Sequence, residues 1–174
     1  MNVQDKLFYY SKSKDVPVGK GTKEIVNDIN KYENLNKIKN WRKILSNFHE
    51  FPFTYDNKKY NTVEHCFQSQ KIKIVNNDIA YKFTLDSNDD IGKGNGETAR
   101  KHRKIVILTP EQLLYWDKIK DSIMKKICHA KYLQCVIYKT VIDNTLDAQL
   151  WHIVSRSKFQ LHTKYLEEIR DNIF

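Results

Sequence analysis

The stretch that decides the fold is TVEHCFQSQK, residues 62–71. Thr62 can cap a helix, because its hydroxyl accepts a hydrogen bond from the first turn, and we expect this helix to reach about Val75. Three polar residues fall on one face of this helix, while apolar residues fall on another. The polar face carries a carboxylate, an amide and an ammonium group, on Glu64, Gln68 and Lys71.

This polar face permits two interpretations. A carboxylate near a helix start can activate water or stabilise a developing oxocarbenium ion, and Lys71 could neutralise a phosphate. Alternatively, Glu64 and Lys71 form a solvent-facing stripe on an amphipathic helix, which is the interpretation that periodicity alone favours.

Short β elements are predicted on the N-terminal side of this helix. Leu7–Tyr10 reads as an apolar strand, and Ser11–Gly21 reads as a loop because it is polar and contains Pro and Gly. Residues 22–40 are polar with sparse apolar positions and predict at most a short helix. Residues 51–60 alternate apolar and polar around Asp56-Asn57, a pair that tolerates the left-handed conformation of tight turns. That pattern predicts a β-hairpin.

The clearest helix in the sequence begins after Thr109. Thr109 can cap it, Pro110 suits the first helical position, and Gln112 completes a capping box. Apolar residues then follow at spacings of three or four and predict a buried stripe. The stripe consists of Leu113, Trp116, Ile119, Ile123 and Ile127.

Further helices are predicted at Ile79–Leu85, Tyr132–Val141 and Phe159–Ile173. The segment IGKGNG, residues 91–96, reads instead as a loop broken by glycines. No repeat or linker interrupts the chain. Together these elements predict a mainly α protein, with one compact multihelical domain over residues 1–174 and a small β-hairpin.

Two further polar segments are candidates for ligand binding. Ser46-Asn47 lies between apolar residues, so Asn47 could cap the backbone in a buried turn or orient a ligand hydroxyl. The basic segment 93–104 has a net charge of +4 from five Lys or Arg and one Glu. Arg100, Arg103 and Lys104 within it could grip a phosphate. Alternatively, the segment is an exposed basic surface turn.

The last candidate segment runs from Asp147 to His152. Trp151 and His152 could stack on a base or a ribose through their flat rings. The alternative is that His152 is a structural residue whose hydrogen bonds are satisfied within the fold. Arg156 and Lys158 follow this segment and add positive charge.

Composition limits the class of protein. The chain has 174 residues, of which 40% are hydrophobic and 29% charged, so a folded domain is expected. No apolar stretch is long enough to span a bilayer and no secretory signal is present, so we expect an intracellular protein without a membrane partner. Cys66, Cys128 and Cys135 are odd in number and widely spaced, which predicts buried free thiols rather than disulfides or a zinc site.

The charge balance indicates the class of partner. The formal net charge is +9 and the isoelectric point is near 9.3. Such a balance favours phosphate-bearing partners, although a lysine-rich solvated surface gives the same numbers. General nucleic-acid binding ranks last among the functions considered, because no recognised nucleic-acid-binding motif is present. The histidines do not form clusters with metal-ligand spacing, so no metal is implied.

Taken in order, several segments resemble the NADAR/YbiA-like family over nearly the whole chain. The combination of Ser-Asn-Phe with Val-Glu-His-x-x-Gln-x-x-Lys is specific. Relative to the shorter members of that family, residues 15–40 are an added segment. The matching segments are Phe8-Tyr9, Leu45–Phe48, Pro52-Phe53, Thr62–Lys71, Ala99–Lys101, Trp116–Ile127 and Leu166–Arg170.

The resemblance implies a mainly helical fold and hydrolysis of N-glycosidic bonds. Members of the family act on ribosylamino-pyrimidine intermediates of riboflavin synthesis, or remove ADP-ribose from modified guanine in nucleic acid. The expected substrate is therefore a phosphorylated ribosyl or ADP-ribosyl compound, with no cofactor and no metal. The implied catalytic residues are Asn47, Glu64 and Asp147, and the implied substrate-binding residues are Gln68, Lys71, Arg100, Trp151 and His152.

One departure from the family pattern leaves two alternatives open. Many members carry Asp-x-x-Trp-Gly before the last helix, with its acidic residue and its Trp in the site, and Asp147–Lys158 has no such motif. Trp151-His152 stands near the position of a Val-Glu pair in the short bacterial form. The chain is therefore expected to be either an N-glycosidase with a different substrate or a module that binds ADP-ribose or a nucleotide without cleaving it.

Overall fold

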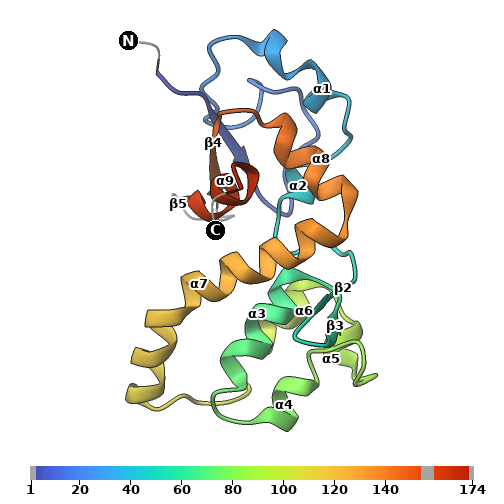
Figure 1. Cartoon of the computed structure of the whole chain (residues 1–174), viewed down its shortest axis with the longest axis vertical. Coiled ribbons are helices and arrows are strands. Elements are labelled where there is room, and N and C mark those ends of the chain that lie inside the picture. The colour runs from blue at the N-terminus through green and yellow to red at the C-terminus, as the bar shows by residue number, and fades with distance from the viewer. Residues whose placement is uncertain (1–2, 154–158, 173–174) are drawn as a thin grey trace. The chain divides into compact units, whose positions relative to one another are not determined.

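The structure is a computed structural model that describes residues 3–153 and 159–172 of the chain. Contacts between residues group the chain into two compact units. Unit 1 comprises Met1–Ser46 and Val136–Phe174, and unit 2 comprises Asn47–Cys135 (Figure 1). Most of the ordered elements are helices, accompanied by a few short strands, which confirms the mainly α class predicted from the sequence.

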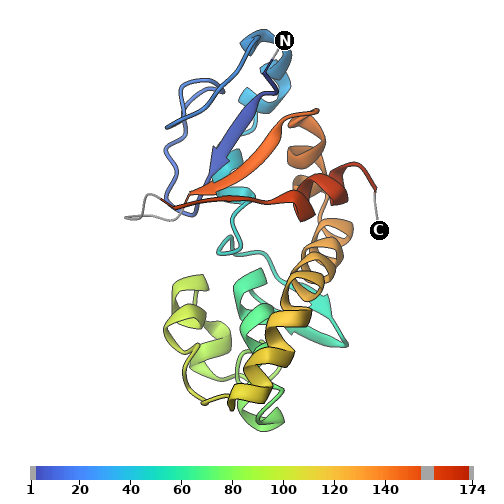
Figure 2. The same ribbon diagram turned by 90° about the vertical axis from the view of Figure 1, so that its left-hand side faces the viewer.

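Unit 1 contains a three-stranded sheet. β1 (Lys6–Tyr9) pairs in parallel with β4 (Gln149–Ile153), and β4 pairs antiparallel with β5 (Gln160–His162). Figure 2 shows β4 in orange between β1 in blue and β5 in red. The helices of the unit are η1 (Ile29–Tyr32, a 3-10 helix), α1 (Glu33–Asn36), α2 (Trp41–Ile44), α8 (Val136–Asn144) and α9 (Lys164–Arg170).

The core of unit 1 draws side chains from both of its sequence segments. Leu7 of β1 and Leu150 of β4 are partners in the parallel register, and both are fully buried. Leu166 and Ile169 of α9, which packs on β4, are also buried. Burial of this apolar area stabilises the sheet in which the two segments meet.

The expected last helix is the clearest error of the sequence prediction. Residues 159–173 were expected to be helical, but β5 comes first and α9 begins at Lys164. Thr163 donates to the carbonyl of Leu150 from both its N–H, at 2.9 Å, and its hydroxyl, at 2.8 Å. Leu161, expected on the buried face, is 46% exposed, because it lies on a strand. Ile173 lies outside the described residues.

Unit 2 is organised around α3, which contacts α4, α6 and α7. Figure 1 shows α3 in green beside the long α7. The elements of the unit are β2 (Phe53–Tyr55), β3 (Lys58–Tyr60), α3 (Val63–Ile72), α4 (Asn77–Tyr81), α5 (Asp90–Lys93), α6 (Gly96–Lys101) and α7 (Pro110–Gln134).

Three local sequence predictions in unit 2 are confirmed. β2 and β3 form the predicted hairpin, and Asp56 and Asn57 at its turn have positive φ angles of 50° and 58°. The hydroxyl of Thr62 accepts a hydrogen bond at the start of α3, as a helix cap does. Thr109 and Gln112 form the predicted capping box of α7.

The apolar stripe of α7 packs in part against α3. Trp116 and Ile127 are buried, and the Trp116 ring lies 5.0 Å from the ring of Phe67 on α3. Leu113, at the start of the stripe, is 44% exposed, and Ile119 and Ile123 are half-buried, so only Trp116 and Ile127 of the predicted stripe are buried.

The bounds of three further helices differ from the prediction. The helix expected at Ile79–Leu85 is α4, which spans Asn77–Tyr81. α3 ends at Ile72 instead of Val75. The helix expected at 132–141 is two helices, because Cys135 is extended, with φ −131° and ψ 115°, between α7 and α8. No glycine or proline marks this break, so nothing in the local sequence indicates it.

The segment expected to be a glycine-broken loop forms α5 and α6. A β-carbon on Gly92 would lie 2.0 Å from the carbonyl oxygen of Thr84, and one on Gly96 would lie 2.6 Å from Cγ of Phe48. These two glycines therefore allow close approach of neighbouring segments instead of loosening the chain. The side chains of Asp89 and Asn95 cap the two short helices.

The three cysteines are buried and free, as the sequence predicts. Within the described part of the chain, no helix has both the length and the apolar character that a membrane crossing requires.

Candidate functional site

The predicted polar face of α3 is partly enclosed within unit 2. Glu64 is half-buried, and its backbone N–H donates to the carbonyl of Asn47 at 3.1 Å. Burial raises the pKa of the Glu64 carboxyl, although a hydrogen bond from Gln68 and nearby positive charges act in the opposite direction. This environment argues against a fully solvated Glu–Lys stripe.

Gln68 lies one helical turn after Glu64 and is only 6% exposed. Its Nε2 donates a hydrogen bond of 2.8 Å to Oε1 of Glu64. Its own Oε1 is buried and has no hydrogen-bond partner among the described residues. A buried acceptor without a donor costs free energy, so a ligand hydroxyl or N–H placed beside Gln68 would stabilise this arrangement.

Asn47 is half-buried at the start of unit 2. Its Nδ2 lies 3.7 Å from the sulfur of Met124, and its Oδ1 lies 3.9 Å from the sulfur of Cys128. Sulfur is a weak hydrogen-bonding partner. The amide of Asn47 therefore retains most of its hydrogen-bonding capacity for a ligand.

Three cations act on the Glu64 carboxylate, and all of them lower its pKa. Lys71 is half-buried on α3, while Arg100 on α6 and Arg103 just after it are exposed. Nη1 of Arg103 donates to the carbonyl of Arg100 at 3.0 Å, which holds the two arginines together. These cations form no ion pair with a carboxylate of the described residues, so their charge is available to an anionic ligand.

His65, next to Glu64, has a structural role. It is fully buried, with Nε2 2.9 Å from the carbonyl oxygen of Ile91 and Nδ1 2.8 Å from the hydroxyl of Thr62. A carbonyl can only accept, so Nε2 carries the proton and Nδ1 accepts from Thr62. Burial lowers the pKa of His65, which keeps the ring neutral. The ring thereby fixes the first turn of α3 and with it the position of Glu64.

Asp147, predicted to be catalytic, belongs to unit 1. Its side chain is 78% exposed and lies 3.3 Å from Nζ of Lys31. Lys31 also pairs at 2.8 Å with Asp5, which is buried. The backbone carbonyl of Asp147 accepts a hydrogen bond from Gln4 at 2.7 Å.

Trp151 and His152 lie on β4, also in unit 1. Because successive side chains of a strand point to opposite faces, the two rings do not form one stacking platform. The Trp151 ring is stacked on His162 at 4.8 Å and lies 6.2 Å from the ring of Phe8. The His152 ring lies 5.4 Å from that of Tyr9. Arg156 and Lys158 lie outside the described residues.

The structure thus brings five of the eight predicted residues into unit 2 and three into unit 1. Two features of the unit 2 group were missed by sequence reasoning. They are the oxygen of Gln68, which has no partner in the described part of the chain, and the sulfur neighbours of Asn47, which come from α7. No sequence signal links Asn47 to Met124. In residues 3–153 and 159–172, no three His, Cys, Asp or Glu side chains gather as a metal site would need.

Comparison of the sequence with protein-family profiles and with curated proteins finds no match. A solved structure does match, the NMR structure of the E. coli protein YbiA. The TM-score is 0.57, the sequence identity is 16%, and the match covers 99% of this chain and 87% of that chain. At this identity the similarity concerns the fold alone. The chain therefore has a mainly α, YbiA-like fold.

Proposed function

We propose that this chain is a member of the NADAR/YbiA-like family and an N-glycosidase. Its substrate is a phosphorylated ribosyl or ADP-ribosyl compound, such as ADP-ribosylated guanine or a riboflavin-pathway ribosylamino-pyrimidine. The observation that carries the proposal is the group around Glu64, in which a half-buried carboxylate lies beside a buried amide oxygen of Gln68 that has no hydrogen-bond partner among the described residues. The YbiA-like fold and the order of the sequence motifs support it.

The proposed reaction is dissociative. The bond between the anomeric carbon and the base nitrogen breaks, its electron pair leaves with the base, and positive charge develops on the ribosyl ring. The Glu64 carboxylate stabilises that charge and accepts a proton from the attacking water, whose oxygen bonds to the anomeric carbon. The base nitrogen gains a proton from solvent and Glu64 returns its proton to solvent, so in sum one water is added across the broken bond.

Other residues of the group bind and orient the substrate. Asn47 and Gln68 hold ribose hydroxyls through their amide groups, which have few competing partners in the fold. Lys71 and Arg100 neutralise phosphate. Asp147, Trp151 and His152 lie in unit 1, and their roles in catalysis and substrate binding stay predictions.

A second candidate function is binding of ADP-ribose or a nucleotide without cleavage. It is favoured by the absence of Asp-x-x-Trp-Gly from residues 147–158. The two candidates differ in whether product forms when enzyme exceeds substrate.

The test compares the wild type with Glu64→Gln on ADP-ribosylated guanine DNA and on a riboflavin-pathway ribosylamino-pyrimidine. Products are measured by mass spectrometry under single-turnover conditions, and ADP-ribose binding is measured by calorimetry. Loss of the carboxylate is expected to slow hydrolysis by about 100-fold or more with little change in binding. Equal turnover by the variant would exclude Glu64 as the catalytic group, and binding without product from the wild type would establish the second candidate.

A further inference from the structure

A cleft of about 360 Å³ lies in unit 1. None of the residues predicted to be catalytic or substrate-binding lines it. Among the residues that the structure describes, its wall is formed by β1, by the loop that follows β1, and by the ends of α2 and β4. The lining residues are Phe8, Tyr10, Ser13, Lys14, Val16, Lys20, Gly21, Thr22, Arg42 and Ile153.

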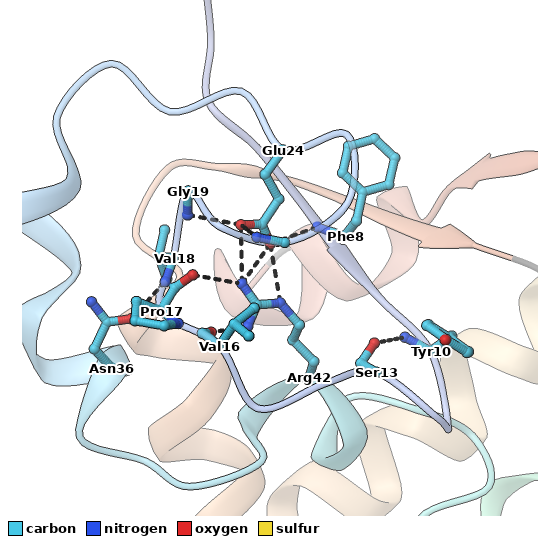
Figure 3. A network of polar contacts seen from close by, with 11 residues as sticks. Phe8, Tyr10, Ser13, Val16, Pro17, Val18, Gly19, Glu24, Asn36 and Arg42 are labelled. Carbon is cyan, nitrogen blue, oxygen red and sulfur yellow. Dashed lines mark hydrogen bonds and ion pairs between the residues drawn. The ribbon is translucent and has the colours of Figure 1, made fainter.

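A buried ion pair fixes the loop that forms one wall of this cleft (Figure 3). Nη2 of Arg42 lies 2.8 Å from Oε1 of Glu24, and the two side chains are 4% and 0% exposed. The Glu24 carboxylate also accepts the N–H groups of Gly19, at 2.8 Å, and Gly21, at 3.1 Å. Arg42 in turn donates to the carbonyl of Pro17 at 3.3 Å and to that of Val16. The wall is therefore held in place without a ligand.

The cleft has an excess of positive charge. Arg42 is offset by Glu24, which leaves Lys14 and Lys20, both exposed at the cleft. Neither ammonium group pairs with a carboxylate of the described residues, and no acidic residue is among the described lining residues. Two unpaired ammonium groups in one concave wall favour a ligand with a doubly charged group such as a phosphate monoester.

The rest of the wall suits a flat apolar group. Two aromatic residues, Phe8 and Tyr10, and two aliphatic residues, Val16 and Ile153, are among its lining residues. Such a mixture of apolar surface and a few placed charges is typical of small-molecule sites, and the volume lies in their usual range. Ser13 and Thr22 add hydroxyl groups that can bond a sugar or a phosphate.

We propose that this cleft is a second ligand site, which binds a nucleoside monophosphate. Lys14 and Lys20 hold the phosphate, and the base lies against Phe8, Tyr10 and Ile153. Four of the described lining residues, Val16, Lys20, Gly21 and Thr22, belong to the segment 15–40. The proposal does not depend on the hydrolytic function of Glu64.

The five glycines of the chain provide the readout. Gly19 and Gly21 belong to unit 1, and Gly92, Gly94 and Gly96 belong to unit 2. In protein labelled with ¹⁵N at glycine, AMP is expected to shift the assigned amide signal of Gly21 and to leave the three unit 2 signals unchanged. Shifts confined to the unit 2 glycines would place the nucleotide elsewhere and overturn the proposal.

Charge-matched variants test the two lysines. The double variant Lys14→Gln/Lys20→Gln is expected to bind AMP at least about tenfold more weakly in calorimetry. The control Lys12→Gln/Lys39→Gln loses the same charge from exposed positions outside the cleft and is expected to bind like the wild type. Equal losses in both variants would mean that net charge alone attracts AMP, which contradicts a built site.

Two partial ligands test the two halves of the site. Adenosine and inorganic phosphate are each expected to bind at least about tenfold more weakly than AMP, because each lacks one set of contacts. Binding of inorganic phosphate as tight as that of AMP would exclude the base contact. Hydrolysis by Glu64→Gln and AMP binding by Lys14→Gln/Lys20→Gln are measured independently, so loss of hydrolysis and loss of this site are separable results.

Discussion

Gln68 donates from its Nε2 to Oε1 of Glu64 at 2.8 Å, across one turn of α3, while its own Oε1 faces no donor among the described residues. One amide therefore has two separate tasks. Its N–H favours the ionised form of the carboxylate, and its oxygen is available to a ligand. The residue thus couples the charge state of Glu64 to the presence of a ligand hydroxyl.

Replacing Gln68 by Leu is expected to impair both tasks while preserving the fold. The hydrogen bond from Gln68 lowers the pKa of Glu64, so its loss should raise that pKa further. We expect kcat/KM for the N-glycoside to fall about tenfold or more. The acid limb of the pH–rate profile should move to higher pH. An unchanged acid limb, with circular dichroism like that of the wild type, would contradict the coupling.

Replacing Arg100 and Arg103, which lie outside α3, should also change the pKa of Glu64. Their positive charges lower the pKa of Glu64, so Arg100→Gln/Arg103→Gln should raise it. Since Glu64 must be ionised to act, activity is expected to fall with decreasing pH, and in the variant to begin falling at higher pH. KM for a phosphate-bearing substrate should also rise.

The matched control for the arginine pair is Lys101→Gln/Lys104→Gln. These exposed lysines flank the arginines, and their charges are not among the causes of the Glu64 shift. The control should keep the wild-type pH profile. If both double variants shifted the profile equally, the effect would be one of net charge and not of position.

Breaking the Glu24–Arg42 ion pair should lower the stability of the fold. Both side chains are almost fully buried, so Glu24→Gln leaves a buried guanidinium without its counter-charge. We expect the free energy of unfolding to fall by about 3 kcal/mol, measured by urea denaturation. The exposed pair Lys139–Asp143, with a distance of 2.7 Å, is the control. Lys139→Gln should change stability by less than about 1 kcal/mol, and equal losses for the two variants would refute the argument.

The environment of Asp5 predicts that the fold loses stability at acidic pH. Burial alone would raise its pKa, but hydrogen bonds from Lys31, Asn27 and Tyr32 outweigh burial and lower the pKa to about 2. A carboxyl with a depressed folded-state pKa stabilises the fold above its unfolded pKa, and this stabilisation is lost as the pH falls toward 2. We expect about 2 kcal/mol to be lost between about pH 4 and pH 2. Over the same pH range, the melting temperature of the Asp5→Asn variant should depend less on pH than that of the wild type. An equal dependence would contradict this assignment.

Local sequence signals predicted the elements whose cause is local. Thr62 and Thr109 cap helices through their own hydroxyls, and Asp56-Asn57 occupies left-handed backbone because of its own side chains. The shared helix of Glu64 and Gln68 was predicted for the same reason, since the two residues are one turn apart, whereas their role in a site was implied by the family resemblance and stays a prediction. These features need no knowledge of distant residues.

The features that were missed depend on distant partners. β4 and β5 form because β1 offers a parallel partner to β4, and a helical period in 159–173 could not reveal this. The glycines of α5 and α6 suggested flexibility, but Thr84 and Phe48 make them necessary for close packing. The ion pair of Glu24 with Arg42 follows no periodic pattern. In each case the local structure is determined by a contact with a residue that is distant in the sequence.

The division of the sequence between the two units also sets an order for folding during synthesis. Unit 2 is one continuous stretch, Asn47–Cys135, whereas β1 of unit 1 must wait for β4, which is translated after the whole of unit 2. The buried side chains of β1, such as Leu7 and Phe8, therefore remain without their strand partner while unit 2 can already collapse. During synthesis, we therefore expect the segment that contains β1 to be the part of the described chain that stays exposed to aggregation for longest.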